Sequence, residues 1–102
     1  MEIPLSHQKV LRAFLADRLG EHYGLQLAKE AGMAPGSVYP ILAKLERQGW
    51  VESAWEGIDP AKTGRPRRRY YKLTGEGESE ALQVLAETAR SLGFFELLGD
   101  RS

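Results

Sequence analysis

The sequence predicts a mainly α-helical protein with one small β-hairpin. Apolar residues recur at helical spacing in three segments between residues 6 and 48, and helical spacing returns after residue 74. Residues 50–56 and 68–73 are rich in residues that favour strands, and a polar segment of turn-forming residues separates them. With 102 residues the chain can build one modest core. We therefore expect a single α+β unit.

The first helix is predicted from about Ser6 to Leu19. Ser6 can accept a hydrogen bond from the exposed amides of the first turn, and Leu5 can pack against Val10 across that turn. Apolar residues then follow at i, i+1, i+4 and i+5, which is typical of a helix buried on one side. Gly20 provides a stop signal after the helix.

A second, shorter helix is predicted over residues 23–31, with Leu25, Leu27 and Ala28 as core contacts. Gly32 ends it, because glycine accepts the left-handed conformation that closes a helix. The next helix begins after only two further residues. Two helices joined by a tight turn with glycine form the helix-turn-helix arrangement.

The third helix is predicted over residues 35–48, and its two faces differ in chemistry. Pro35 suits the first helical position, where its missing N–H is not needed. The apolar face consists of Val38, Ile41, Leu42 and Leu45, and the opposite face of Gly36, Pro40, Ala43, Lys44 and Arg47. Small residues on an exposed helix face favour the close approach of another molecule.

After the third helix, Gly49 is a stop signal, and a polar loop joins predicted strands at 50–56 and 68–73. Thr74 is a suitable cap for the last helix, because its side chain can bind the exposed amides there. We expect Gly93 to weaken or break that helix. The order helix, helix, helix, strand, loop, strand, helix is that of a winged helix-turn-helix with an added C-terminal helix.

The charges of the chain are strongly segregated although they cancel overall, with 14 basic and 14 acidic residues. Residues 60–73 contain six basic residues and no acid, a local charge of +6. Residues 74–102 contain six acids and two arginines, a local charge of −4. Since salt screens charges over about 8 Å, a ligand responds to the local charge.

The helix at 35–48 and the basic loop after it have the chemistry of a DNA-binding surface. Hydroxyl groups near the positively polarised helix start can bind phosphate or a base edge, and basic side chains further along can reach phosphate or guanine. An arginine on a stiff hairpin tip suits phosphate binding or insertion into the minor groove. The predicted DNA-binding residues are Ser37, Tyr39, Lys44, Arg47, Lys62, Arg65, Arg67 and Arg68. The alternatives are an ordinary amphipathic surface helix and a solvated cluster of charge.

An apolar stripe at 3-4-3 spacing in the last predicted helix consists of Leu82, Leu85, Ala89 and Leu92, as in a short coiled coil. The stripe can pack on its own domain or on a second copy. We favour a homodimer, with Phe95 added to its interface, because three helices already pack together and leave the fourth with an unpaired face. A dimer also places two groove-binding helices about 34–36 Å apart, which suits a palindromic DNA site.

Aromatic residues near the hairpin and in the last helix allow two interpretations. Trp50, Trp55 and Phe94 could line a pocket between subunits for a small aromatic or hydrophobic effector. Alternatively they fill the core and the interface, which is the commoner use of large aromatic side chains.

The sequence argues against catalysis, metals and membranes. It has no cysteine, and its two histidines, His7 and His22, lie 15 residues apart on unlike segments, so a zinc site would lack ligands. No nucleophile–base pair or glycine-rich phosphate loop is visible. We therefore expect no catalytic residues, no metal and no cofactor. The apolar runs are too short for a membrane span and the first residues lack the basic start of a signal peptide, so we expect a cytoplasmic protein.

Several motifs recur together in one known family. They are Tyr23-Gly24, the run from Pro35 to Val51, Gly64-Arg65-Pro66-Arg67, Tyr70-Tyr71-Lys72-Leu73-Thr74 and Gly77. Over roughly residues 8–85 the chain resembles the PadR family of bacterial transcriptional regulators. The resemblance implies a dimeric winged helix-turn-helix repressor that binds an inverted repeat and is sometimes released by a phenolic or drug-like ligand. It also implies that Ser37, Tyr39 and Lys44 face DNA and that the last helix dimerises.

The chain departs from the family pattern in two places. Family members commonly have serine or threonine as the cap of the helix that corresponds to the third helix here, where this chain has Ala34. The part after the wing is short, as in the smaller subgroup with one C-terminal helix. We expect residues 1–75 to form the DNA-binding domain and residues 76–102 the dimerisation helix. Two other functions stay open: a winged-helix module that binds an acidic protein partner, and a DNA-binding accessory factor of a mobile element.

Overall fold

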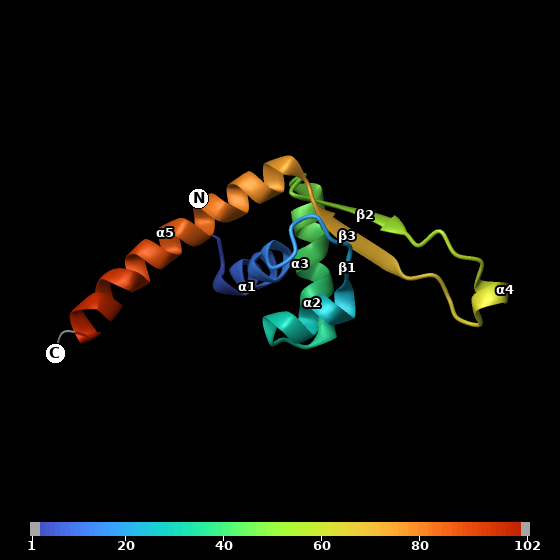
Figure 1. Ribbon diagram of the computed structural model, residues 1–102, viewed down its shortest axis with the longest axis horizontal. Coiled ribbons are helices and arrows are strands. Elements are labelled where there is room, and N and C mark those ends of the chain that lie inside the picture. The colour runs from blue at the N-terminus through green and yellow to red at the C-terminus, as the bar shows by residue number, and fades with distance from the viewer. Residues whose placement is uncertain (1–2, 101–102) are drawn as a thin grey trace.

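A helical core carries two long extensions in this computed structural model, which describes residues 3–100, with side chains through residue 92. The elements are α1 (Leu5–Leu15), β1 (His22–Tyr23), α2 (Gly24–Ala31), α3 (Pro35–Arg47), β2 (Val51–Trp55), α4 (Pro60–Thr63), β3 (Arg69–Leu73) and α5 (Gly75–Asp100). The hairpin that carries α4 and the far end of α5 point in opposite directions (Figure 1). The molecule is accordingly elongated, with extents of 61 × 25 × 22 Å. The predicted fold class, mainly α with a small β component, is confirmed.

The core lies where α1, α2 and α3 meet, and it is apolar. Its fully buried large side chains are Phe14, Leu11, Leu27, Leu42, Leu45, Val10, Val38 and Val51. Leu25 was predicted to join them, but it is 65% exposed. The buried face of α2 consists of Leu27, Ala28 and Ala31, and Leu25, two residues before Leu27, points to the other side of the helix.

The first helix differs from its prediction at both ends. It begins at Leu5, with Pro4 as its N-cap and no side-chain cap, so the predicted capping role of Ser6 is wrong. It ends at Leu15 because the chain tightens into turns, in which Asp17 N–H donates to Phe14 O at 3.1 Å. These turns reverse the chain and bring the next residues to the sheet.

The sheet has three antiparallel strands in the order β1-β3-β2. The predicted hairpin is β2 and β3, paired from Val51↔Leu73 to Trp55↔Arg69. The strand β1 was not predicted, because its two residues carry no periodicity. It forms by pairing His22 with Tyr71 on the free edge of β3. We call residues 51–73, which comprise β2, α4 and β3, the wing.

A short helix, α4, forms the tip of the wing, where the sequence predicted only a loop. Asp59 caps it, since its Oδ1 accepts a hydrogen bond from Ala61 N–H at 3.0 Å. Gly64, with φ of 72°, ends it in the left-handed conformation.

The long helix α5 is anchored at its start and along α1. As predicted, Thr74 caps it: the Oγ1 accepts from Gly77 N–H at 3.0 Å and donates to Gly49 O at 2.7 Å. A Cβ on Gly77 would overlap the carbonyl oxygen of Trp50, so only glycine fits there. The predicted break at Gly93 is wrong, because α5 runs to Asp100; a cost of about 1 kcal/mol for one glycine does not end so long a helix.

Candidate nucleic-acid interface

The outward face of α3 presents small and basic residues. Those at its centre, all exposed, are Gly36, Pro40, Ala43 and Arg47. The opposite face is buried and consists of Val38, Ile41, Leu42 and Leu45. The predicted division of this helix into an apolar buried face and a small, basic exposed face is confirmed. Pro40 lies on the exposed side, where the backbone carbonyl that it leaves without an intrahelical partner can be hydrated.

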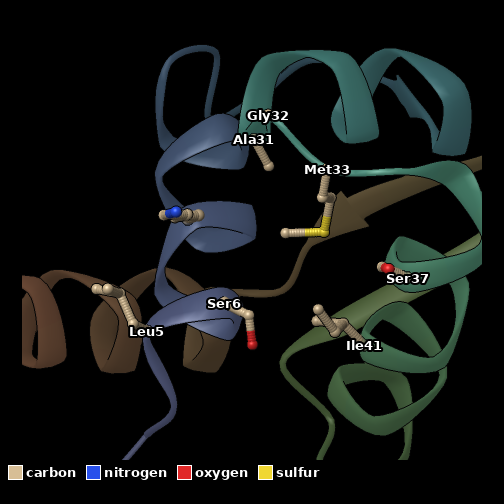
Figure 2. Close-up of a pocket in the computed structure, with 8 residues that line it drawn as sticks. Leu5, Ser6, Ala31, Gly32, Met33, Ser37 and Ile41 are labelled. Carbon is tan, nitrogen blue, oxygen red and sulfur yellow. The ribbon is translucent and has the colours of Figure 1, made fainter.

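Ser37 and Lys44 flank this face on the side of α1, and both are exposed. Figure 2 shows Ser37 at the edge of a hollow between α1 and α3, into which Met33 of the α2–α3 turn projects. Partial burial first, and then the positive charge of Lys44, lower the pKa of His7 on α1. The exposed face of α3 is thus bordered by the start of α1.

Tyr39 flanks the same face on the side of the sheet and is 45% exposed. Its ring lies directly against Gly24, the first residue of α2. A Cβ on Gly24 would lie 2.5 Å from Tyr39 Cε1, so the ring keeps this position only because residue 24 is glycine. In the sequence, Gly24 stood out only as part of the Tyr23-Gly24 family motif. Its contact with Tyr39 gives it a structural role.

Four basic residues of the wing are exposed: Lys62, Arg67, Arg68 and Arg69. Arg67 Nε donates to Ile58 O at 3.0 Å, which orients the side chain along the wing. The guanidinium of Arg68 lies over the ring of Tyr23, 5.8 Å from its centroid. These contacts are compatible with a second ligand, because each guanidinium keeps further N–H donors.

Arg65, by contrast, is paired within the protein. Its two terminal nitrogens donate to the two carboxylate oxygens of Glu56 at 2.7 and 3.1 Å. The hydrogen bond from Arg65, followed by one from the backbone of Arg68 and by their charges, lowers the pKa of Glu56 from 4.5 to about 2. The same pairing raises the pKa of Arg65. Sequence reasoning placed Arg65 among the DNA-binding residues and did not consider Glu56, which lies nine residues away.

Arg69 joins the wing to α3, and sequence reasoning gave it no role. It donates to Ser53 Oγ at 2.7 Å, and Ser53 Oγ in turn donates to Glu46 of α3 at 2.7 Å. The guanidinium also lies over the ring of Trp55, 5.5 Å from its centroid. The residues of this cluster come from α3 and from both strands of the hairpin. They meet because the register places Trp55 opposite Arg69 and Ser53 opposite Tyr71, and the sequence alone does not show that register.

The predicted dimer stripe lies on α5 beyond the core. Leu82 is 47% and Leu92 56% exposed, while Leu85 is half-buried and Ala89 exposed. Leu85, Ala89 and Leu92 line a groove between α5 and α1, together with Leu5, which is 60% exposed. Phe95 lies outside the described side chains.

Of the predicted effector residues, the structure describes the side chains of Trp50 and Trp55 and places them apart within one chain. Trp50 precedes β2 and packs partly buried against the core, whereas Trp55 ends the strand and is 57% exposed. At about 3.3 Å per residue the two are roughly 16 Å apart. Phe94 lies outside the described side chains.

Within the described residues, no three His, Cys, Asp or Glu gather as a metal site would require. In the same part of the chain, no helix combines the length and apolar character that a membrane crossing needs.

A helix-turn-helix followed by a hairpin beside the second helix defines the winged helix-turn-helix class. Solved structures share this fold, and their sequences differ widely. A mutant of ZitR from Lactococcus lactis has a TM-score of 0.76 at 16% identity, covering 100% of this chain and 64% of that one. The DNA complex of wild-type ZitR has a TM-score of 0.69 at 17% identity, with 100% and 64% covered. The transcriptional regulator BldR from Sulfolobus solfataricus has a TM-score of 0.71 at 19% identity, with 96% and 63% covered. The chain thus spans under two thirds of the length of these neighbours.

The chain belongs to the transcriptional regulator PadR-like family, whose model matches residues 13–83. The match confirms the resemblance seen in the sequence. No curated protein sequence matches the chain.

Proposed function

We propose that the protein binds double-stranded DNA as a homodimer in the cytoplasm and represses a promoter that contains an inverted repeat. The observation that carries the proposal is one exposed surface, made of the small, basic face of α3 and the basic wing. Membership of a family of transcriptional regulators supports this function. So does the fold shared with ZitR, a neighbour solved in complex with DNA.

On this proposal α3 enters the major groove. Its small exposed residues, among them Gly36 and Ala43, let the helix backbone approach the base edges. Lys44 and Arg47, near its C-terminal end, reach phosphate or guanine. Ser37 and Tyr39, on opposite flanks near its start, place hydroxyl groups beside the two walls of the groove.

The wing lies along the neighbouring backbone and supplies positive charge. Its exposed basic residues include Lys62, Arg67 and Arg68. Their contacts with phosphate are independent of sequence, so they add affinity and salt dependence and leave sequence selection to α3.

The homodimer is proposed to form through α5, with the exposed leucines of the stripe packed against a second copy. Leu82 and Leu92, each about half exposed, would lose contact with water on association, which is favourable by about 25 cal/mol per Å² of apolar surface. A twofold dimer would present two copies of α3 to two half-sites of an inverted repeat.

A small aromatic or hydrophobic effector is a further part of the proposal. Within one chain such a ligand fits the α1–α5 groove, which leucines, Lys9 and Arg12 line. Since Leu85, Ala89 and Leu92 belong to the dimer stripe as well, the ligand would compete there with the second copy. Trp50 and Trp55 could share a pocket only across subunits.

Selection of bound sequences from a random duplex library tests the proposal. We expect an inverted repeat to be enriched, and a gel shift with the enriched duplex to show one complex of two chains per duplex. A protein-interaction module would bind neither the library nor an unrelated duplex. For an accessory factor of a mobile element, the enriched site should lie at element ends and be absent from the protein's own promoter.

A further inference from the structure

The tip of the wing has little backbone pairing to hold it. The ladder between β2 and β3 ends at Trp55↔Arg69, and one further backbone bond, from Glu56 N–H to Arg68 O at 2.9 Å, closes the hairpin beyond it. Past this point the chain continues through α4 before it returns. The position of the tip therefore depends on side chains.

One of those side-chain contacts joins Arg67 Nε to Ile58 O at 3.0 Å, and others converge on the carboxylate of Glu56. Its Oε1 accepts from Arg65 Nη1 at 2.7 Å and from the backbone N–H of Arg68 at 2.7 Å. Its Oε2 accepts from Arg65 Nη2 at 3.1 Å. Arg65 Nη1 also lies 3.2 Å from Pro66 O. One carboxylate thus binds the segment between α4 and β3 at two residues, Arg65 and Arg68.

Burial separates this pair from Lys62, Arg67 and Arg68. The side chain of Glu56 is 10% exposed and that of Arg65 37% exposed, whereas Lys62, Arg67 and Arg68 are exposed. Two parallel N–H···O bonds to a carboxylate match the geometry of a guanidinium well. A phosphate would have to replace Glu56 before Arg65 could bind it in the same way.

We infer that Glu56 and Arg65 form an internal clamp that positions the tip of the wing for DNA, and that Arg65 acts as a positioning residue without contacting DNA itself. The inference rests on the proposed function and deepens it. On this view the DNA contacts of the wing come from Lys62, Arg67 and Arg68. Without the clamp, the tip has to be ordered on binding, and the entropy lost in ordering it weakens the complex.

The variant Glu56→Gln gives a test in which the two explanations predict opposite signs. If Arg65 contacts phosphate, the loss of a competing negative charge next to the DNA should strengthen binding. If the clamp positions the wing, the same change should weaken binding about tenfold, since a charged hydrogen-bonded pair is broken. Arg65→Gln should weaken binding by a similar factor, and the double variant E56Q/R65Q should be no worse than either single variant.

Glu52→Gln is the matched control. Glu52 lies exposed on β2 and pairs in register with Lys72, so this change removes one negative charge from the same strand and leaves the clamp intact. Its affinity for the enriched duplex should stay within about twofold of the parent. Exchange of the Arg68 amide hydrogen should accelerate in E56Q and R65Q but not in E52Q.

Anisotropy titrations with the enriched duplex measure the affinity of each variant for DNA, and circular dichroism confirms that each variant keeps its helices. Tighter binding by E56Q, or additive losses in the double variant, would overturn the inference while leaving the proposed function intact. Failure of the parent protein to bind any duplex would instead remove the proposed function.

Discussion

The arginines of the wing differ in what each guanidinium faces. Arg65 is held by Glu56, Arg69 joins Ser53 and the ring of Trp55, and Arg67 and Arg68 are exposed. The sequence shows a run of equivalent basic residues and gives a local charge of +6 for residues 60–73. It could not assign the individual roles, because those depend on the cross-strand register and on the path of the loop.

The pKa of Glu56 gives a prediction for this residue alone. With a pKa of about 2 against an ordinary 4.5, the ionised carboxylate stabilises the folded wing at any pH above 4.5, and this contribution is lost as the pH falls through about 2. In an NMR titration of the side-chain carboxyl carbon, the midpoint for Glu56 should lie near pH 2. In R65Q it should rise towards 4.5. An ordinary midpoint in the parent protein would contradict the clamp.

Gly36→Ala should separate stability from DNA binding. A Cβ at this position meets no atom within 4 Å, and alanine is favoured over glycine in a helix by up to about 1 kcal/mol. The free energy of unfolding, measured with urea, should therefore rise. On the proposed DNA face the same methyl group would hold α3 away from the groove, and affinity should fall about tenfold.

Gly75→Ala is the control for this change. Gly75 begins α5, and a Cβ there also meets no atom within 4 Å, but it lies outside the proposed DNA face. This variant should gain stability without losing affinity. If G36A binds DNA as tightly as the parent, the exposed face of α3 does not enter a groove.

At the scale of elements, the long periodic segments were predicted and the short ones were missed. The helices α2 and α3 and the strands β2 and β3 lie within a residue or so of their predicted bounds, because burial of one face imposes a period that the sequence displays. The strand β1 and the helix α4 have two and four residues. Elements so short depend on a partner strand or a cap, and neither leaves a periodic signal.

The helix α5 yields a prediction at the same scale. Leu92, 56% exposed on the predicted stripe, would be buried in the proposed dimer, so Leu92→Asp should convert the protein to monomers in sedimentation equilibrium. Burying a carboxylate without a partner costs several kcal/mol. Since a monomer binds only one half-site, affinity for the inverted repeat should fall at least a hundredfold.

Gln83→Asp is the control for L92D, because it adds the same charge to an exposed position of α5 away from the stripe. This variant should stay dimeric. If L92D also stays dimeric, the stripe is not the interface.

At the scale of the whole molecule, the segregation of charge along the sequence becomes a separation in space. The wing with its basic residues extends to one side of the core, and α5 extends to the other (Figure 1). Although the formal net charge is zero, the net positive and net negative segments of the chain therefore lie on opposite sides of the core. This arrangement could be predicted from the charges of the segments and the order of the elements. The length of 61 Å could not be predicted, because a break at Gly93 was expected to make the last helix shorter.

The salt dependence of DNA binding shows whether α3 and the wing hold DNA together. If each protomer neutralises about four phosphates, the log–log slope of affinity against salt for the dimer should be near −7. In the double variant R67A/R68A, which removes two basic residues per protomer, the slope should fall to about −3.6. A slope that is the same in the parent and the variant would mean that Arg67 and Arg68 do not contact phosphate, and the proposed role of the wing in DNA binding would be wrong.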